Sequence, residues 1–274
     1  MVKILSGVLL VLLSAVTLAD EAKKEITVCA ISVANPPFYL HATEDPTHED
    51  YAKGVAFDLM ADLESRLDIK IKVKRNPWKR CLLLVEKGEI DGVLGASYLA
   101  ERRTIGRYPL TANDEPDYSK LLYSSDYWLY AIDPKVTWDG KQLIIPEGTQ
   151  AGTGLGFSAA KLLAKQNVPV VEEFYPQRLV ELLVNKRVSV IAGYTYQFAN
   201  AIAQSPFPEA IIRLTPPLQQ DDMFLMFSHQ FYNQQQPLAE SVWSALADIH
   251  RSGQYEATMR DYLLQLNNVQ SAKN

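Results

Sequence analysis

Ser97 and Arg102 are the residues of this chain best suited, by type and spacing, to bind an anion. A guanidinium is a rigid fork of N–H donors that matches both oxygens of a carboxylate, and a nearby hydroxyl adds a donor. A helix starting near Ala100 would direct unpaired backbone N–H groups toward the same point. A simpler alternative stays open, in which Arg102 pairs with Glu101 or another surface acid while Arg103 faces solvent.

A second candidate contact is Gly148-Thr149, which follows a predicted strand. A glycine there would let the backbone approach a ligand closely, and the threonine hydroxyl can donate to it. Glycines recur at alternate positions from 152 to 156, but Phe157 stands where a dinucleotide-binding pattern needs glycine. No Gly-Lys-Ser/Thr follows either. We therefore interpret this stretch as a loop that leads into a helix, without nucleotide binding.

Groups for catalysis or metal binding are scattered along the chain. The histidines form no close pairs with cysteine, so no usual metal-ligand spacing occurs, and we expect no metal and no cofactor. Glu172 and Glu173 follow a predicted strand and are candidates for a general acid, which would have to sit in a closed cleft with a raised pKa. The alternative for these two glutamates is a solvated charge pair at the end of a strand.

The N-terminus predicts export. Lys3 precedes the apolar run Ile4 to Leu18, and Thr17-Leu18-Ala19 places small residues where signal peptidase cleaves. We predict a signal peptide over residues 1–19 and a periplasmic mature protein, with an uncleaved membrane anchor as the alternative. The net charge of -5 is spread over the chain without a basic block, which argues against a nucleic-acid partner.

Export also permits a disulfide between the cysteines, Cys29 and Cys81. Such a bridge would close a long loop and tie the first strand to a following helix. Two buried free thiols are the alternative, because a sequence does not supply the geometry that a bridge requires.

The elements that position these residues begin with an alternation of strands and helices. ITVCAISV is a β-rich run that ends at Asn35-Pro36-Pro37, and Pro77 and Gly88 mark the start and end of a helix. The predicted strands are 26–33, 69–73 and 90–94, and the predicted helices are 54–67 and 78–87. This order is typical of a parallel sheet covered by helices.

The same pattern then starts again after a long β-rich stretch, 121–132. Strands are predicted at 143–145, 168–171, 188–192, 211–214 and 223–227, with helices at about 157–165, 176–185 and 238–264, the last broken near Gly253. We expect two α/β lobes joined by two extended crossings. Lobe 1 would comprise residues 20–124 plus 218–274 and lobe 2 residues 125–217, with the ligand in the cleft between them.

Several segments resemble the family 3 extracellular solute-binding proteins, the periplasmic receptors typified by polar amino-acid uptake by ABC transporters. The matching segments are Gly54-Val55-Ala56-Phe57-Asp58-Leu59, Pro77-Trp78, Gly88-Glu89-Ile90-Asp91-Gly92, Ser97-Tyr98-Leu99-Ala100-Glu101-Arg102, Gly148-Thr149, Ala247-Asp248-Ile249 and Gly253-Gln254-Tyr255. The resemblance implies a two-lobed α/β fold of the periplasmic-binding-protein type II, with two hinge strands. It also implies that Ser97 and Arg102 hold the carboxylate of a ligand.

The resemblance further places Phe38 and Trp78 around the ligand, with Tyr123, Trp128 and Tyr194 as candidates for the other side. The alternative for each of these aromatic residues is a place in the core or at a hinge. Amino-acid receptors of the family usually carry an acid for the ligand's α-amino group, and here Tyr194 stands at that position. The carboxylate clamp is therefore the better supported half of the site.

We predict a solute-binding protein that closes by hinge motion on a small polar carboxylate, such as an amino acid or a related compound. The protein would be a monomer without enzymatic activity, and its partner a membrane ABC permease or the outer domain of a sensor. The alternative is an exported enzyme of the same fold, a dehydratase or a lytic transglycosylase that uses a cleft glutamate.

Overall fold

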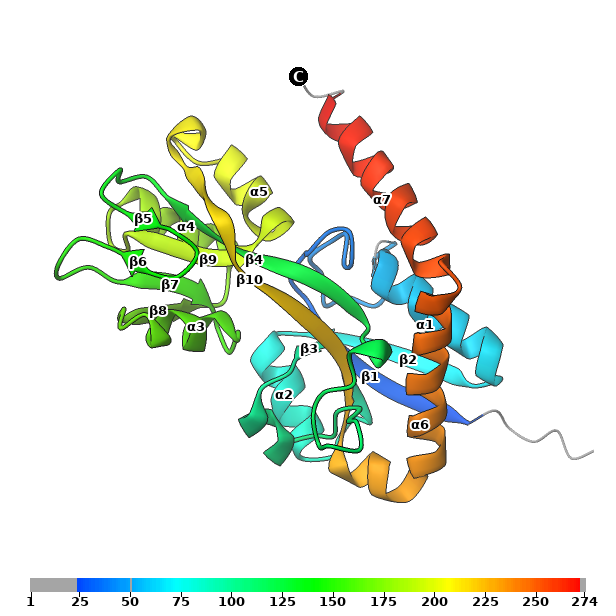
Figure 1. The fold of residues 1–274 in the computed structure, drawn as a ribbon. Helices are drawn as coiled ribbons and strands as arrows, with labels where there is room; N and C mark the ends of the chain where they lie inside the picture. The colour runs from blue at the N-terminus through cyan, green and yellow to red at the C-terminus, as the bar shows by residue number, and fades with distance from the viewer. Residues whose placement is uncertain (1–23, 50, 272–274) are drawn as a thin grey trace, which may run out of the picture.

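The computed structural model describes residues 24–49 and 51–271 and contains two α/β lobes. The first lobe holds three strands covered by helices on both faces (Figure 1). Its elements are β1 (Glu25–Ile31), α1 (Val55–Leu67), β2 (Lys70–Asn76), α2 (Trp78–Glu86), β3 (Gly92–Ser97), α6 (His229–Arg251) and α7 (Gln254–Ser271). β1 runs parallel to both β2 and β3, which confirms the predicted strand–helix alternation.

The second lobe repeats this arrangement with shorter elements. They are β5 (Thr137–Trp138), β6 (Leu143–Ile144), β7 (Ala151–Gly154), α3 (Ala159–Lys165), β8 (Val170–Glu173), α4 (Pro176–Val184), β9 (Val190–Tyr194) and α5 (Thr195–Ala203). β7 lies between β8 and β9 and is parallel to both. β5 and β6 pair only with each other, as a small separate sheet.

Two long strands connect the lobes: β4 (Tyr123–Ala131) and β10 (Ile212–Phe227). They lie side by side and antiparallel, and they cross from one lobe to the other (Figure 1). The complete sheet has the order β2-β1-β3-β10-β4-β9-β7-β8. Three 3-10 turns, η1 (Ala100–Thr104), η2 (Tyr118–Lys120) and η3 (Pro208–Ala210), complete the described elements.

The prediction of a loop over the glycine-rich stretch was wrong. Ala151–Gly154 is β7, a central strand, and all four of its residues are buried. A Cβ on Gly152 would lie 2.8 Å from Leu179 of α4, and one on Gly154 would meet the ring of Phe157 at 2.8 Å. The glycines therefore permit close packing in a strand, whereas sequence reasoning takes them as signs of a turn.

The second crossing also differs from expectation. Residues 211–214 and 223–227 were predicted as separate strands, with Pro216-Pro217 between them, but both belong to β10. The pairing with β4 shifts between Leu214 and Gln219, so the prolines occupy an irregularity where no ladder hydrogen bond is required.

A disulfide joins Cys29 of β1 to Cys81 of α2, with 5.5 Å between their Cα atoms. Both residues are fully buried in an apolar cluster that includes Trp78, Val85 and Tyr108. The bridge therefore fixes the start of α2 against the sheet.

Among the described residues, no helix combines the length and the hydropathy that a bilayer crossing requires. The predicted signal peptide, residues 1–19, lies outside the described residues and stays a prediction.

Candidate functional site

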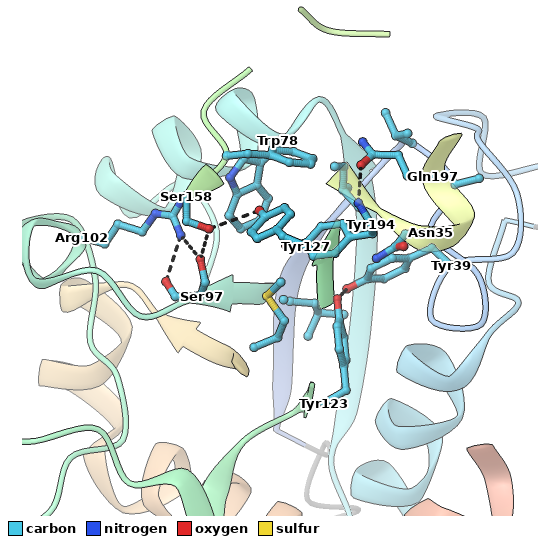
Figure 2. A pocket seen from close by; sticks show the side chains of 17 residues that line it. Asn35, Tyr39, Trp78, Ser97, Arg102, Tyr123, Tyr127, Ser158, Tyr194 and Gln197 are labelled. Carbon is cyan, nitrogen blue, oxygen red and sulfur yellow. Dashed lines mark hydrogen bonds between the residues drawn. The ribbon is translucent and has the colours of Figure 1, made fainter. Parts of the chain in front are cut away.

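A small cavity, part of it open to solvent, lies between the two lobes at the crossing strands. Side chains from both lobes and from β4 and β10 line it (Figure 2). The lining residues are Ile31, Val33, Ala34, Asn35, Tyr39, Trp78, Leu94, Gly95, Ser97, Arg102, Tyr123, Tyr127, Phe157, Ser158, Tyr194, Gln197 and Met223. The site is thus concave, largely apolar and fitted with a few polar groups, as small-molecule sites are.

Arg102 is the one charged residue among the lining residues, and it is 6% exposed. Its Nη1 donates to the carbonyl and the hydroxyl of Ser97, at 2.9 and 2.8 Å, and its Nη2 donates to the carbonyl of Gly156 at 3.0 Å. These bonds use three of the five N–H donors of the guanidinium, and the side chain of Tyr108 is a further hydrogen-bond partner of Arg102. The guanidinium also lies 5.7 Å from the ring centre of Trp78.

The alternative pairing of Arg102 with a surface acid does not occur among residues 24–49 and 51–271. Glu101 instead forms an ion pair with Lys161 of α3 in the second lobe, and Arg103 pairs with Asp114. The buried guanidinium is therefore held by neutral groups, and no directly paired counterion lies beside it among the described residues.

A chain of hydroxyls connects Arg102 to the second lobe and to a crossing strand. Ser97 Oγ donates to Ser158 Oγ at 2.9 Å, and Ser158 lies 3.0 Å from Oδ2 of Asp221 on β10. The hydroxyl of Tyr194 donates to the same Oδ2 at 3.2 Å. The anion clamp, the second lobe and the hinge region therefore share one polar network.

Asp221 is the functional residue that the sequence reasoning missed. It is 4% exposed and lies behind the lining residues, and burial raises its pKa to about 6. The hydrogen bond from Ser158, the charge of Arg102 and the hydrogen bond from Tyr194 oppose this rise, while Asp222 adds to it. The available signal was the pair Asp221-Asp222 inside a β-rich crossing segment, where a buried acid is unusual.

The raised pKa of Asp221 predicts a stability that falls with rising pH. Between about pH 4 and 6 the folded protein keeps a proton that the unfolded chain has lost, so its free energy of unfolding decreases with pH across this window. Relative to Asp221→Asn, which does not titrate there, the wild type should lose about 2 kcal/mol between pH 4 and 7. Urea unfolding of both proteins at several pH values measures this difference.

Asp126→Asn is the matched control, since it removes a carboxylate from the neighbouring strand β4 and leaves Asp221 in place. We expect this variant to keep the wild-type pH profile. A difference between Asp221→Asn and the wild type that does not change with pH would show that Asp221 titrates normally.

Aromatic rings form most of the cavity wall. Tyr127 and Tyr194 stack with 4.3 Å between their ring centres and 19° between their planes. Tyr39 and Tyr123 share a hydrogen bond of 3.2 Å between their hydroxyls. Burial raises the pKa of Tyr39 to about 12 and also raises the pKa of Tyr123, Tyr127 and Tyr194. These rings are therefore neutral at physiological pH.

The end of the cavity away from Arg102 carries neutral amides. Figure 2 shows Arg102, Ser97 and Ser158 on one side and Asn35, Tyr39 and Gln197 on the other, with Tyr127 and Tyr194 between them. Gln197 Oε1 accepts the backbone N–H of Tyr194 at 3.3 Å, which leaves its amide N–H groups as donors.

Four of the six predicted ligand-binding residues line this cavity: Trp78, Ser97, Arg102 and Tyr194. Phe38 does not, because its ring is buried and stacks on Tyr123 at 3.8 Å. Thr149 also lies outside, since it precedes β7 and its hydroxyl donates to the carbonyl of Pro146. The second lobe instead contributes Phe157 and Ser158, which follow β7.

Of the other candidates, Tyr123 lines the cavity, whereas Trp128 and the two glutamates do not. The ring of Trp128 packs under the guanidinium of Arg213 at 4.1 Å. Glu172 accepts the backbone N–H of Gly156 at 2.6 Å, and neither it nor Glu173 lines the cavity.

The two lobes touch each other at the Arg102 end of the cavity. Gly156 of the second lobe accepts hydrogen bonds from both Arg102 and Trp78 Nε1, the latter at 3.2 Å. With the Ser97–Ser158 and Glu101–Lys161 contacts, these bonds hold the lobes together. The structure therefore has a closed arrangement.

Comparisons with known proteins agree with this architecture. The family described as bacterial extracellular solute-binding proteins, family 3, matches residues 27–265. No curated protein matches the chain.

Solved structures share the fold at low sequence identity. The GluR0 ligand-binding core from Nostoc punctiforme, in complex with L-glutamate, is 15% identical with a TM-score of 0.64, and the match covers 86% of this chain and 98% of that one. A periplasmic His/Glu/Gln/Arg/opine family-binding protein from Silicibacter pomeroyi, in complex with lysine, is 12% identical with a TM-score of 0.65, covering 86% and 96%. A histidine kinase sensor domain with similarity to periplasmic binding proteins is 14% identical with a TM-score of 0.66, covering 88% and 96%.

Proposed function

This chain belongs to the bacterial extracellular solute-binding proteins of family 3, and we propose that it captures a small carboxylate-bearing ligand between its lobes. Arg102 carries this proposal, because it is buried at the cavity without an ion-pair partner among the described residues and its hydrogen-bond partners are neutral groups. A ligand carboxylate supplies the missing counterion.

Closure of the lobes is the proposed binding step. Ser97, Arg102 and Trp78 come from the first lobe, whereas Phe157, Ser158 and Tyr194 come from the second. A ligand that contacts both sets favours the closed state by its differential affinity for that state. We propose lobe boundaries at residues 124/125 and 217/218, close to the start of β4 and within β10.

The cellular role follows from this capture. We propose that residues 1–19 are a signal peptide and that the mature protein is a periplasmic monomer. It would deliver its ligand to a membrane ABC permease or report it to the outer domain of a sensor. The similar structures include both a sensor domain and the substrate-binding protein of an amino-acid ABC transporter, so they favour neither partner.

A thermal-shift screen of residues 20–274 against organic acids, amino acids, dipeptides and polyamines tests the proposal. A ligand present at 100 times its Kd stabilises the folded state by about 2.7 kcal/mol, which for a chain of this size raises Tm by roughly 5–10 °C. We expect such a shift with a carboxylate and none with polyamines. The absence of a shift with every carboxylate in the screen would contradict the proposal.

A further inference from the structure

We propose that the ligand is a carboxylate attached to a flat, uncharged group such as an aromatic ring, and that it carries no ammonium group. This inference rests on the proposed function, because it assumes that Arg102 holds a carboxylate. The inference specifies which class of carboxylate the rest of the cavity would accept. Three features of the site support it.

The first feature is the absence of a carboxylate among the residues that line the cavity. An ammonium group taken out of water needs an acceptor of opposite charge or several oxygen acceptors. Asp221 is a buried acid of the same polar network, but it lies behind Ser158 and Tyr194, and both of their hydroxyls contact its Oδ2. A ligand cannot reach this oxygen without displacing those side chains.

The second feature is that the carbonyl oxygens next to Arg102 are already used. The carbonyl of Ser97 accepts from Arg102 and from the hydroxyl of Tyr108 at 2.8 Å. The carbonyl of Gly156 accepts from Arg102 and Trp78. A carbonyl oxygen has two lone pairs, so neither can take an ammonium proton as well. In an α-amino acid the ammonium lies beside the carboxylate, and it would therefore meet the charge of Arg102 and only neutral hydroxyl oxygens.

The third feature is the shape and polarity of the remaining wall. Rings of Tyr39, Trp78, Tyr123, Tyr127, Phe157 and Tyr194 surround the cavity. Aromatic contacts contribute about 0.5–1.5 kcal/mol each beyond the burial of apolar area, which favours a planar group over a flexible chain. The far end offers the neutral amides of Asn35 and Gln197, which suit an uncharged polar substituent.

Calorimetric titration of residues 20–274 at pH 7.5 with matched pairs of compounds tests this inference. 3-Phenylpropionate and L-phenylalanine differ only in the ammonium group, as do 3-indolepropionate and L-tryptophan. Hexanoate keeps the carboxylate and lacks the ring, and 2-phenylethylamine keeps the ring and reverses the charge. We expect at least one of the ring-bearing acids to bind about tenfold or more tightly than its amino-acid counterpart and than hexanoate, with no binding of the amine.

The outcomes separate the inference from the proposed function. Amino acids that bind as tightly as their deaminated counterparts, with the affinity lost in Arg102→Ala, overturn the inference and leave the carboxylate clamp intact. Hexanoate that binds as tightly as the ring-bearing acids also overturns it. If neither these acids nor the amino acids bind, the inference fails, and the proposed function is decided by the broader carboxylate screen. The test varies the ligand, so it does not depend on whether a substituted protein folds.

Discussion

Arg102→Ala is expected to weaken binding of the best carboxylate from the thermal-shift screen by about 100-fold or more. Removing one partner of a buried, hydrogen-bonded charge pair costs about 2–5 kcal/mol, and each 1.4 kcal/mol is a factor of ten in Kd. The substitution removes the guanidinium that would hold the ligand and the bond to Gly156 that links the lobes. Calorimetric titration measures the change in Kd.

Arg102→Lys distinguishes the contribution of the positive charge to binding from that of the planar guanidinium. Lysine keeps the positive charge but not the planar fork, so we expect it to recover only part of the lost affinity. Arg103→Ala is the matched control, because this neighbouring arginine pairs with Asp114 at the surface and does not line the cavity. Its affinity should equal that of the wild type, and circular dichroism checks that all three variants fold. Full affinity in a folded Arg102→Ala would mean that the carboxylate binds elsewhere.

The local part of this site could be predicted from the sequence because the residues that form it are close together. Ser97 ends β3 and Arg102 lies in the turn that follows. The two side chains are therefore close because only four residues separate them in the chain. Trp78 could likewise be placed, since Pro77 marks the start of α2. The end of a strand and the start of a helix are determined mainly by neighbouring residues, so both can be predicted without knowledge of the whole fold.

The parts of the site that the sequence did not predict depend on contacts between distant segments. Asp221 reaches the network only because β10 crosses beside β4 and brings it under Ser158 and Tyr194. Thr149 was favoured because it follows a predicted strand, but that strand is β6, which pairs only with β5, and β7 begins two residues after Thr149. Phe38 was predicted beside the ligand, but its ring is buried and stacks on Tyr123.

These observations give the crossing strands a chemical role as well as a mechanical one. Tyr123 and Tyr127 of β4 and Met223 of β10 line the cavity, and Asp221 holds two side chains of the second lobe. A ligand that rearranges this network therefore acts directly on the segments that must bend when the lobes open. This coupling suits a protein whose closed state is the signal to its partner.

Loss of the Cys29–Cys81 disulfide is expected to lower the free energy of unfolding by about 4 kcal/mol. The bridge spans 52 residues of sequence, and closing a loop of this length removes about that much conformational entropy from the unfolded chain. Cys29→Ala with Cys81→Ala is the suitable double substitution, because both side chains are fully buried among apolar residues and serine would bury two hydroxyls. Urea unfolding with and without reductant measures the effect.

The same bridge supports the binding site, because Cys81 lies one helical turn after Trp78 on α2. We therefore expect the double variant to bind the carboxylate more weakly, although neither cysteine touches the cavity. Reduced wild type should match the double variant in stability, and reductant should leave the double variant unchanged. If reductant leaves the stability of the wild type unaltered, the two thiols are not bridged in the folded protein, and α2 must be held by packing against the sheet alone.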